Sequence, residues 1–227
     1  MSIIEVLPIA LLGGLLGLDV VSFPQAMFSR PLVAATLSGA LVGQPSSGLL
    51  IGVALELVAL ETLPFGASRY PEWGSAAVVG GAIFSEHPSH PPGAMTIAAL
   101  GALATTWVGG WTMVKLRQLN ARWARARRDS LEAGARGTVI SLQLMGLTAD
   151  LVRGALLTLI AFLILSPLAD ATIGLWTTDA RLSRSLVVAT VASVAVGAAW
   201  KLFHATAGAR WFFVGGLAVG LVILFAT

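Results

Sequence analysis

Four side chains of the kinds that bind hydroxyl groups stand in or beside apolar stretches early in the chain: Asp19, Gln25, Glu56 and Glu72. A carboxylate accepts charge-assisted hydrogen bonds from hydroxyl groups, and a glutamine amide both donates and accepts. Ionisable side chains inside membrane segments cost about 2.5 to 3.5 kcal/mol each, and by default they mark the path of a solute. We therefore expect these four residues to bind a neutral solute that carries several hydroxyl groups.

Arg30 lies among these residues, at a predicted helix start just before Pro31. Its guanidinium group can contact the solute, or it can pair with Asp19 or Glu56 merely to lower the cost of burying a charge. For Arg30 we favour the ion pair, whereas for Gln25 and Glu56 we favour solute binding.

The composition indicates the surroundings of these polar side chains. The chain has 227 residues, of which 56% are hydrophobic and 11% are charged, and its mean hydropathy is +0.86. Because a soluble domain has about 25% charged residues, we expect an integral membrane protein with a single membrane domain over residues 1–227. The chain has no cysteine, which excludes disulfides, thiolate nucleophiles and cysteine-based metal sites.

Most of the chain's basic character is concentrated in residues 115–137, which contain only two acidic residues. A segment rich in lysine and arginine beside a membrane span usually lies on the cytoplasmic side, against anionic headgroups of the lipid bilayer. A docking surface for a cytosolic protein is compatible with that placement. Nucleic acid is not expected as a partner, because no nucleic-acid-binding motif accompanies the charge. The cations are Lys115, Arg117, Arg122, Arg125, Arg127, Arg128 and Arg136.

The apolar segments differ in length, and the difference is informative. A helix needs about 20 apolar residues to cross a bilayer core of about 30 Å. Segments 31–42, 48–63 and 75–84 are too short alone and are separated by turn-forming sequences. Such interruptions are tolerated at membrane depth only where the backbone is buried in protein or lines a cavity, and they point to a transporter's binding site. The segments nearer full length are Ile3–Val21, Ala94–Val114, Leu151–Leu168, Leu186–Trp200 and Trp211–Ala226.

These lengths predict an all-α polytopic membrane protein, with several transmembrane helices and short, interrupted or re-entrant helical hairpins. The alternative for the short segments is a pair of tilted full spans joined by a surface turn, and we favour the hairpins. Residues 1–93 would form the solute-binding half with the hairpins, residues 115–137 the basic cytoplasmic segment, and residues 138–227 the remaining spans.

Six short motifs follow one another in the first 72 residues: LD at 18–19, FPQ at 23–25, SRPLVAATLSG at 29–39, GLLIGVALELVAL at 48–60, GAS at 66–68 and YPE at 70–72. In order and spacing they resemble the IIC (permease) component of the mannose/fructose/sorbose family of bacterial sugar phosphotransferase systems. Members of that family show a Leu-Asp, a Phe-Gln ahead of His-Arg-Pro-Leu, a Thr-Leu-x-Gly, a glycine–isoleucine run, a Leu-Glu or Leu-Gln, and an Ala-Pro-Asp.

The resemblance implies a sugar-translocating subunit of the bacterial inner (plasma) membrane that works with a IID membrane subunit in an oligomeric complex. Cytosolic IIA and IIB proteins then pass a phosphoryl group from phosphoenolpyruvate to the incoming sugar, for which a mannose-type hexose is the first expectation. The phosphorylated histidines belong to those partners. No catalytic residue, cofactor or metal is therefore expected in this chain, which shows no motif for phosphoryl transfer.

Several positions depart from the family's pattern. Ser29 stands where the family has histidine, Pro24 splits the Phe-Gln pair, and the segment 61–66 replaces an amide-bearing motif and introduces Glu61. Because a pocket recognises hydroxyl groups through a few placed polar groups, such changes can alter sugar recognition. Glu61 is a further candidate binding residue, and so is Trp73, whose ring could stack on a sugar face beside Glu72. The alternative function is a diverged small-solute transporter or sensor of the same fold, uncoupled from phosphorylation.

A metal site is the least supported interpretation of the sequence. Glu86, His87 and His90 lie together in the segment SEHPSHPPG, and these residue types do bind zinc. Two adjacent prolines and a glycine indicate a loop at the membrane edge, however, and no fourth ligand is evident. An unrelated membrane enzyme or scaffold that uses this loop is the third and least favoured hypothesis.

Overall fold

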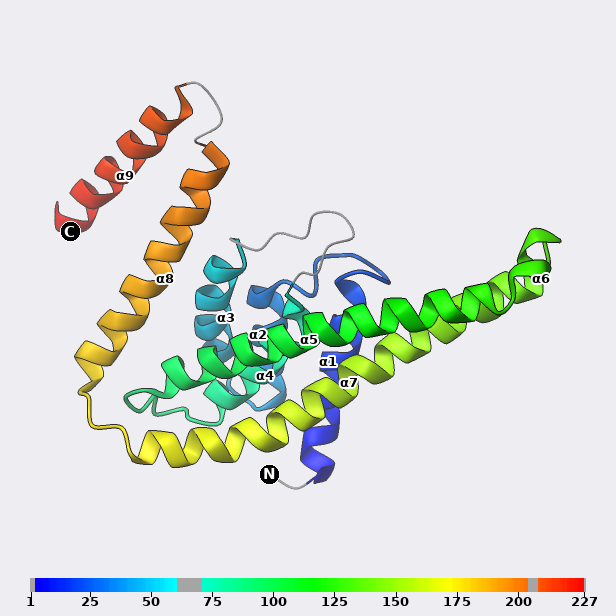
Figure 1. Cartoon of the computed structure of the whole chain (residues 1–227). Helices are drawn as coiled ribbons and strands as arrows, with labels where there is room; N and C mark the ends of the chain where they lie inside the picture. Colours follow the sequence, from blue (N-terminus) through cyan, green and yellow to red (C-terminus); the bar gives the residue numbers. More distant parts are fainter. Residues whose placement is uncertain (1–2, 61–70, 204–207, 227) are drawn as a thin grey trace.

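Helices account for all regular structure in the residues that the computed structural model describes, which are 3–60, 71–203 and 208–226 (Figure 1). Only structures that satisfy every backbone hydrogen bond internally can cross lipid, and for a short segment that means a helix. The predicted all-α fold with long and short helices is thus confirmed. The helices are α1 (Ile3–Asp19), α2 (Pro31–Leu41), α3 (Pro45–Ala59), α4 (Trp73–Ser85), α5 (Ala94–Arg125), α6 (Arg128–Glu132), α7 (Arg136–Gly174), α8 (Ala180–Phe203) and α9 (Ala209–Ala226).

Helix α4 is the centre of the bundle. All of its 13 residues are buried, and it packs against α1, α2, α3, α5 and α7. Its sequence, WGSAAVVGGAIFS, is rich in small residues that let neighbouring backbones come close. A Cβ atom added to Gly81 would lie 2.7 Å from the backbone of Ala35 in α2. A helix of this composition can therefore be enclosed on every side.

Helices α2 and α3 form an antiparallel hairpin. Each begins with a proline at its first turn, a position where the missing backbone N–H costs nothing. Gly43, with a φ of +79°, makes the turn between them. With 11 and 15 residues at about 1.5 Å per residue, both helices are shorter than a bilayer core. The short hairpin expected from the sequence is present, and its re-entrance into the membrane stays a prediction.

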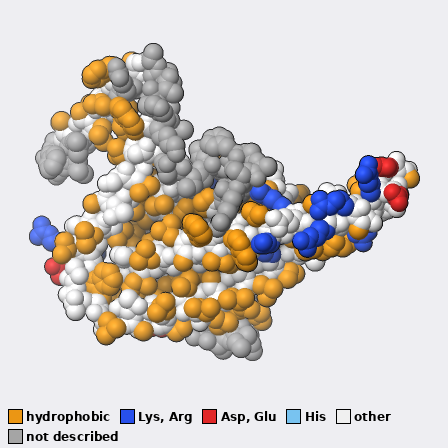
Figure 2. Space-filling model, in the orientation of Figure 1, with side chains coloured by type: hydrophobic (Ala, Val, Ile, Leu, Met, Phe, Trp, Pro, Cys, Tyr) orange, Lys and Arg blue, Asp and Glu red, His pale blue; other side chains and the backbone are white. Residues whose placement is uncertain are grey.

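The basic segment, residues 115–137, is largely helical. Helix α5 continues from its apolar part through Lys115 to Arg125, and α7 returns from Arg136. In Figure 1 these helical extensions project well away from the rest of the bundle, and Figure 2 shows lysine and arginine side chains gathered along them. The change in hydropathy near Val114 therefore does not mark a helix end, because arginine, leucine and glutamine are themselves good helix formers.

Three helices within the described residues are long and apolar enough to cross a bilayer: Ala94–Ala126, Arg136–Gly174 and Ala180–Trp200. The first and last spans expected from the sequence correspond to α1 and α9, whose described parts count as shorter apolar helices. Large apolar side chains lie exposed on the outer faces of the bundle, among them Leu11, Trp107 and Ile160 at 57%, 70% and 54%. Figure 2 shows such side chains over most of the visible surface of the bundle. An exterior with so many exposed apolar side chains suits contact with lipid.

Candidate functional site

The structure brings the predicted polar residues to one end of the bundle. Asp19 is the last residue of α1, Arg30 directly precedes α2, Glu56 lies in the last turn of α3, and Glu72 directly precedes α4. Arg30 and Glu56 are in contact, and Gly17 of α1 lies against the carboxylate of Glu72. Four helix ends that are far apart in sequence thus meet in one region.

Asp19 organises the loop between α1 and α2. It is 3% exposed, and its two carboxylate oxygens accept hydrogen bonds from the backbone amides of Ala26 and Ser29 at 2.7 and 2.8 Å. Gln25 lies in this loop with a φ of +60°, and its side chain is exposed and donates to the carbonyl of Val21. Asp19 therefore holds the loop that presents Gln25.

Arg30 and Glu56 form an ion pair between α2 and α3. Glu56 also accepts a hydrogen bond of 3.2 Å from the backbone amide of Leu32 in the first turn of α2, where a negative charge is favoured by the helix dipole. The side chains of Arg30 and Glu56 are 32% and 21% exposed, so they remain open to a solute. Of the two partners anticipated for Arg30, the structure places Glu56 in contact with it.

Glu72 is a buried charge at the start of the central helix. It is 1% exposed; its Oε1 caps α4 by accepting a 3.0 Å hydrogen bond from the amide of Ser75. Its Oε2 is buried and has no hydrogen-bond partner among the described residues. Gly109 of α5 makes room for this side chain, since an added Cβ there would lie 3.1 Å from Oε2. Trp73 is also buried, at 8%, and Glu61 lies outside the described residues.

Sequence reasoning missed the pair Asp150 and Arg153 on α7. Arg153 Nε donates to Asp150 at 2.9 Å, and Arg153 Nη1 donates to the hydroxyl of Thr112 at 3.3 Å. The second Asp150 oxygen accepts from Ser22, in the loop after α1. The signal was available: two opposite charges three residues apart inside an apolar run would lie on one face of a helix.

The Arg153 guanidinium lies close to Glu72. A Cβ atom added to Gly17 would be 3.5 Å from Arg153 Nη2 and 3.7 Å from Glu72 Oε1. Nη2 is buried and, like Glu72 Oε2, has no hydrogen-bond partner within the described part of the chain. Buried polar atoms without partners are rare and require an explanation. One acceptor and one donor thus remain available deep in this end of the bundle.

The arrangement suits recognition of a hydroxylated solute. It offers carboxylates, a guanidinium group and an amide, which are the groups that hold a hydroxylated solute in a fixed orientation. Within the described residues, no three histidine, aspartate or glutamate side chains are grouped to hold a metal ion. His87 instead lies between the carbonyl of Ile83 and the carboxylate of Asp170, at 2.9 and 3.0 Å.

Curated relatives match part of the chain. The PTS system mannose-specific EIIC component of Escherichia coli (strain K12) is 34% identical over 82 residues, covering 34% of this chain and 31% of that protein. The sorbose-specific EIIC component of Klebsiella pneumoniae is 32% identical over 89 residues, covering 37% and 34%. The matched segment therefore spans about a third of each relative's length.

Solved structures match the fold along the whole chain. One, described as the structure of a membrane protein, has a TM-score of 0.76 at 18% identity and covers 100% of this chain and 92% of its own. A second, the cryo-EM structure of the mannose transporter ManYZ in complex with microcin E492, has a TM-score of 0.61 at 19% identity and covers 97% and 87%. At these identities the likeness establishes the fold alone.

The sequence profile of one protein family matches nearly the whole chain, from residue 3 to residue 224. The six motifs of the first 72 residues lie inside that match. The chain belongs to the family described as the sorbose-specific IIC component of the PTS system (EII-Sor).

Proposed function

We propose that this chain is the sugar-translocating subunit, IIC, of a mannose-type phosphoenolpyruvate-dependent phosphotransferase system in a bacterial inner membrane. The family match over residues 3–224 supports this general function. The observation that carries the assignment of the site is the group of buried charges around Glu72, at the end of an otherwise apolar bundle. Buried charges contribute little net stability, so their retention in a membrane protein favours a role in the solute path.

The proposed solute is a neutral hexose of the mannose type. Glu72 Oε2 and Arg153 Nη2 are two of the four buried side-chain atoms without a hydrogen-bond partner among the described residues, and they would supply an acceptor and a donor for its hydroxyl groups. Glu56, Gln25 and Arg30 are more exposed and would complete the site at its outer side. Asp19 would act indirectly, by holding the loop that carries Gln25.

The proposal includes partners that this chain does not contain. A IID membrane subunit would cover the apolar faces of the bundle, and cytosolic IIA and IIB proteins would deliver the phosphoryl group to the bound sugar. The task of this chain is then to bind and orient the sugar and to exclude water, and none of its own residues becomes phosphorylated. The solved structure of the mannose transporter ManYZ, whose fold this chain shares, supports an assembly of more than one subunit.

The test is sugar uptake into cells, or into right-side-out membrane vesicles, that contain this chain and a IID subunit in the membrane and the matching IIA and IIB proteins inside. We expect labelled sugar to accumulate as sugar phosphate, and only when phosphoenolpyruvate is supplied. The chain expressed without the IID subunit should give no uptake. Phosphorylated product formed equally well in the absence of this chain would overturn the proposal.

The alternative is a small-solute transporter or sensor of the same fold that is uncoupled from phosphorylation. It is favoured by the departures at Pro24 and Ser29, which fall in the loop that Asp19 organises. The same vesicle experiment separates the two functions. Entry of unmodified solute, independent of phosphoenolpyruvate, would support the uncoupled transporter.

A further inference from the structure

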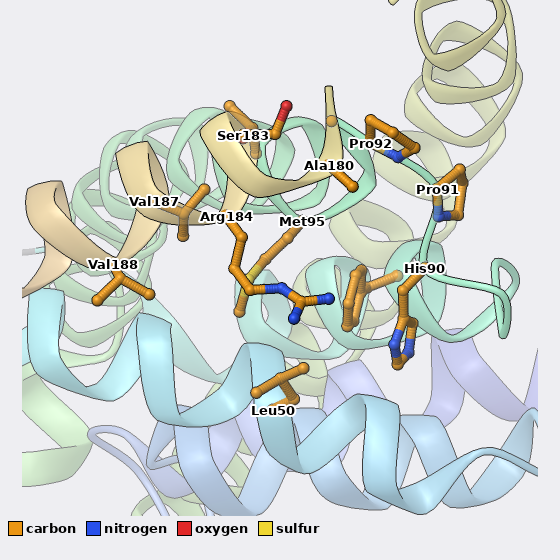
Figure 3. A pocket seen from close by; sticks show the side chains of 13 residues that line it. Leu50, His90, Pro91, Pro92, Met95, Ala180, Ser183, Arg184, Val187 and Val188 are labelled. Carbon is orange, nitrogen blue, oxygen red and sulfur yellow. The ribbon is translucent and has the colours of Figure 1, made fainter. Parts of the chain in front are cut away.

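A crevice lies at the other end of the bundle, remote from the Glu72 region. Helix α4 runs for 13 residues from Trp73 to Ser85, or about 20 Å at about 1.5 Å per residue, and Phe84 near its C-terminal end lines the crevice. The other walls come from α3, the loop before α5 and the first turns of α8 (Figure 3). Its volume is about 350 Å³.

Arg184 extends from α8 into this crevice, between Leu50 of α3 and the ring of His90 (Figure 3). Among the described residues, no acidic residue lines the crevice and Arg184 has no ion-pair partner. The nearest acid along the chain, Asp179, accepts a 2.8 Å hydrogen bond from the amide of Leu182 and so caps α8. Arg184 is exposed at the mouth of this apolar crevice, so its guanidinium group is open to an anion that can form charge-assisted hydrogen bonds with it.

Two kinds of surface line the crevice beside Arg184: an ordered group around His90 and an apolar surface along α3 and α8. The ring of His90 stacks on Phe84, with 4.7 Å between ring centroids, and its Nε2 lies 2.8 Å from the hydroxyl of Ser47. Leu50, Val187 and Val188 continue away from the guanidinium along α3 and α8. Leu50 and Val188 are 47% and 60% exposed, so the apolar surface continues from the crevice onto the outside of the bundle.

The surroundings of Arg184 are typical of the level of lipid headgroups in a membrane protein. It is one turn into α8, which begins at Ala180, and it is close in sequence to Trp176, whose indole donates a 2.9 Å hydrogen bond to Ser183 in the same turn. Trp176 also packs against Gly93, at the start of α5. Tryptophan is enriched at the level of the membrane interface. The crevice therefore joins a cation at headgroup level to an apolar surface that faces the bilayer core.

We infer that this crevice binds an anionic phospholipid, with the headgroup phosphate on Arg184 and an acyl chain along Leu50, Val187 and Val188. Helix α8 contacts the body of the bundle only through α3 and α5 within the described residues. A lipid in the crevice would fill the space between α8 and α3 and would hold α8 against the rest of the bundle. Free phosphate satisfies the guanidinium group but leaves the apolar wall uncovered, so a two-part ligand fits the crevice better.

The experiment measures lipid binding to the purified full-length chain, or to its complex with a IID subunit, by native mass spectrometry with added phosphatidylglycerol. Arg184→Gln should weaken the binding of phosphatidylglycerol about tenfold, the effect of losing one charge-assisted hydrogen bond. Arg181→Gln is the matched control, because Arg181 is an exposed arginine in the same turn that does not line the crevice. It should bind phosphatidylglycerol like the parent.

A second variant tests the crevice without removing its charge. Val187→Trp places a large ring in the space between α8 and α3, and it should reduce phosphatidylglycerol binding while Arg184 is retained. Unchanged binding by both Arg184→Gln and Val187→Trp would overturn the inference. Thermal stabilisation of the parent by inorganic phosphate as strong as that by phosphatidylglycerol would also overturn it, because a free anion would then be the ligand. Loss of phosphatidylglycerol binding on assembly with the IID subunit would assign the crevice to an acidic side chain of that partner instead.

Discussion

Glu56 has two proposed roles: it stabilises the contact between two helices, and it binds the solute. It neutralises Arg30 and accepts the amide of Leu32, which stabilises the junction of α2 and α3. Its side chain is 21% exposed, which is more than the side chains of Asp19 and Glu72 in the same region. A solute can therefore reach it. Its two partners do not use all the acceptor capacity of two carboxylate oxygens. Glutamine at position 56 keeps one acceptor oxygen, so Glu56→Gln tests how far solute binding depends on the second oxygen and on the charge.

We predict that Glu56→Ala weakens sugar affinity about tenfold to a hundredfold, as expected for losing a charge-assisted hydrogen bond worth about 1.5 to 3 kcal/mol. Glu56→Gln should be milder, since its one amide oxygen can still accept from either Arg30 or Leu32, which now donate to different oxygens of Glu56. Gln25→Ala should fall between the parent and Glu56→Ala. The measurement is sugar binding or uptake by variants that insert and assemble normally. If all three variants transport like the parent, these side chains are structural.

Two substitutions of Glu72 can separate its capping of α4 from its proposed role in solute binding. Glu72→Gln retains an oxygen that can accept from the amide of Ser75, so we expect the helix cap to survive and sugar uptake to fall at least tenfold. Glu72→Ala loses the cap as well, which typically costs about 1 kcal/mol, and it leaves Arg153 with less compensation. Thermal unfolding and uptake are measured together. Full uptake by a stable Glu72→Gln variant would contradict a role for this carboxylate in binding.

At the scale of helices, the sequence predicted that the short elements exist but not every boundary. Helix α2 begins at Pro31 as expected, whereas α3 begins at Pro45, before the predicted start at residue 48, and ends at Ala59 rather than at residue 63. Proline is well tolerated at the first helical position, so Pro45 starts the helix instead of extending the turn at Gly43. The three-residue spacing of Asp150 and Arg153 was a signal for an ion pair, but their contacts with Ser22 and Thr112 depend on how α1, α5 and α7 come together. Hydropathy also did not predict the ends of the helices at the basic segment, because α5 and α7 continue beyond their apolar parts.

The α2–α3 hairpin depends on a close approach of two glycines, and this gives a prediction for the element. A Cβ added to Gly39 would lie 2.8 Å from Cα of Gly48, so the two helices must separate to accept a methyl group. We expect Gly39→Ala to lower the thermal stability of the assembled protein, at a cost of about 1 to 3 kcal/mol for overpacking. Uptake should fall with it, since Arg30 and Glu56 sit at the ends of this hairpin.

Gly197→Ala in α8 is the matched control for Gly39→Ala. An added Cβ there meets nothing within 4 Å, and alanine favours a helix interior over glycine by about 1 kcal/mol. This variant should be as stable as the parent or slightly more so. Equal stability of Gly39→Ala and Gly197→Ala would show that the hairpin can relax and that its glycines are not required for packing.

The two ends of the molecule differ in charge. The end formed by the extensions of α5 and α7 with α6 carries the seven cations of residues 115–137 (Figure 2). At the other end, Arg181 and Arg184 are accompanied by the acids Glu86, Asp170 and Asp179. Cytoplasmic segments near membrane spans carry an excess of lysine and arginine. We therefore predict one orientation for the whole molecule, with the basic extensions in the cytoplasm.

The orientation can be tested because the chain has no cysteine, so each introduced thiol is unique. Ser130 in α6 and Ser89 in the loop before α5 are both exposed and lie toward opposite ends of the molecule. In intact cells, an impermeant thiol reagent should label Ser89→Cys and spare Ser130→Cys, and permeabilised cells should label both. The physical reason is that the cations beside Ser130 would have to cross the bilayer core to reach the outside, at a cost of about 2.5 to 3.5 kcal/mol each. Labelling of Ser130→Cys and protection of Ser89→Cys in intact cells would show the opposite orientation. The Arg184 crevice would then lie on the cytoplasmic side.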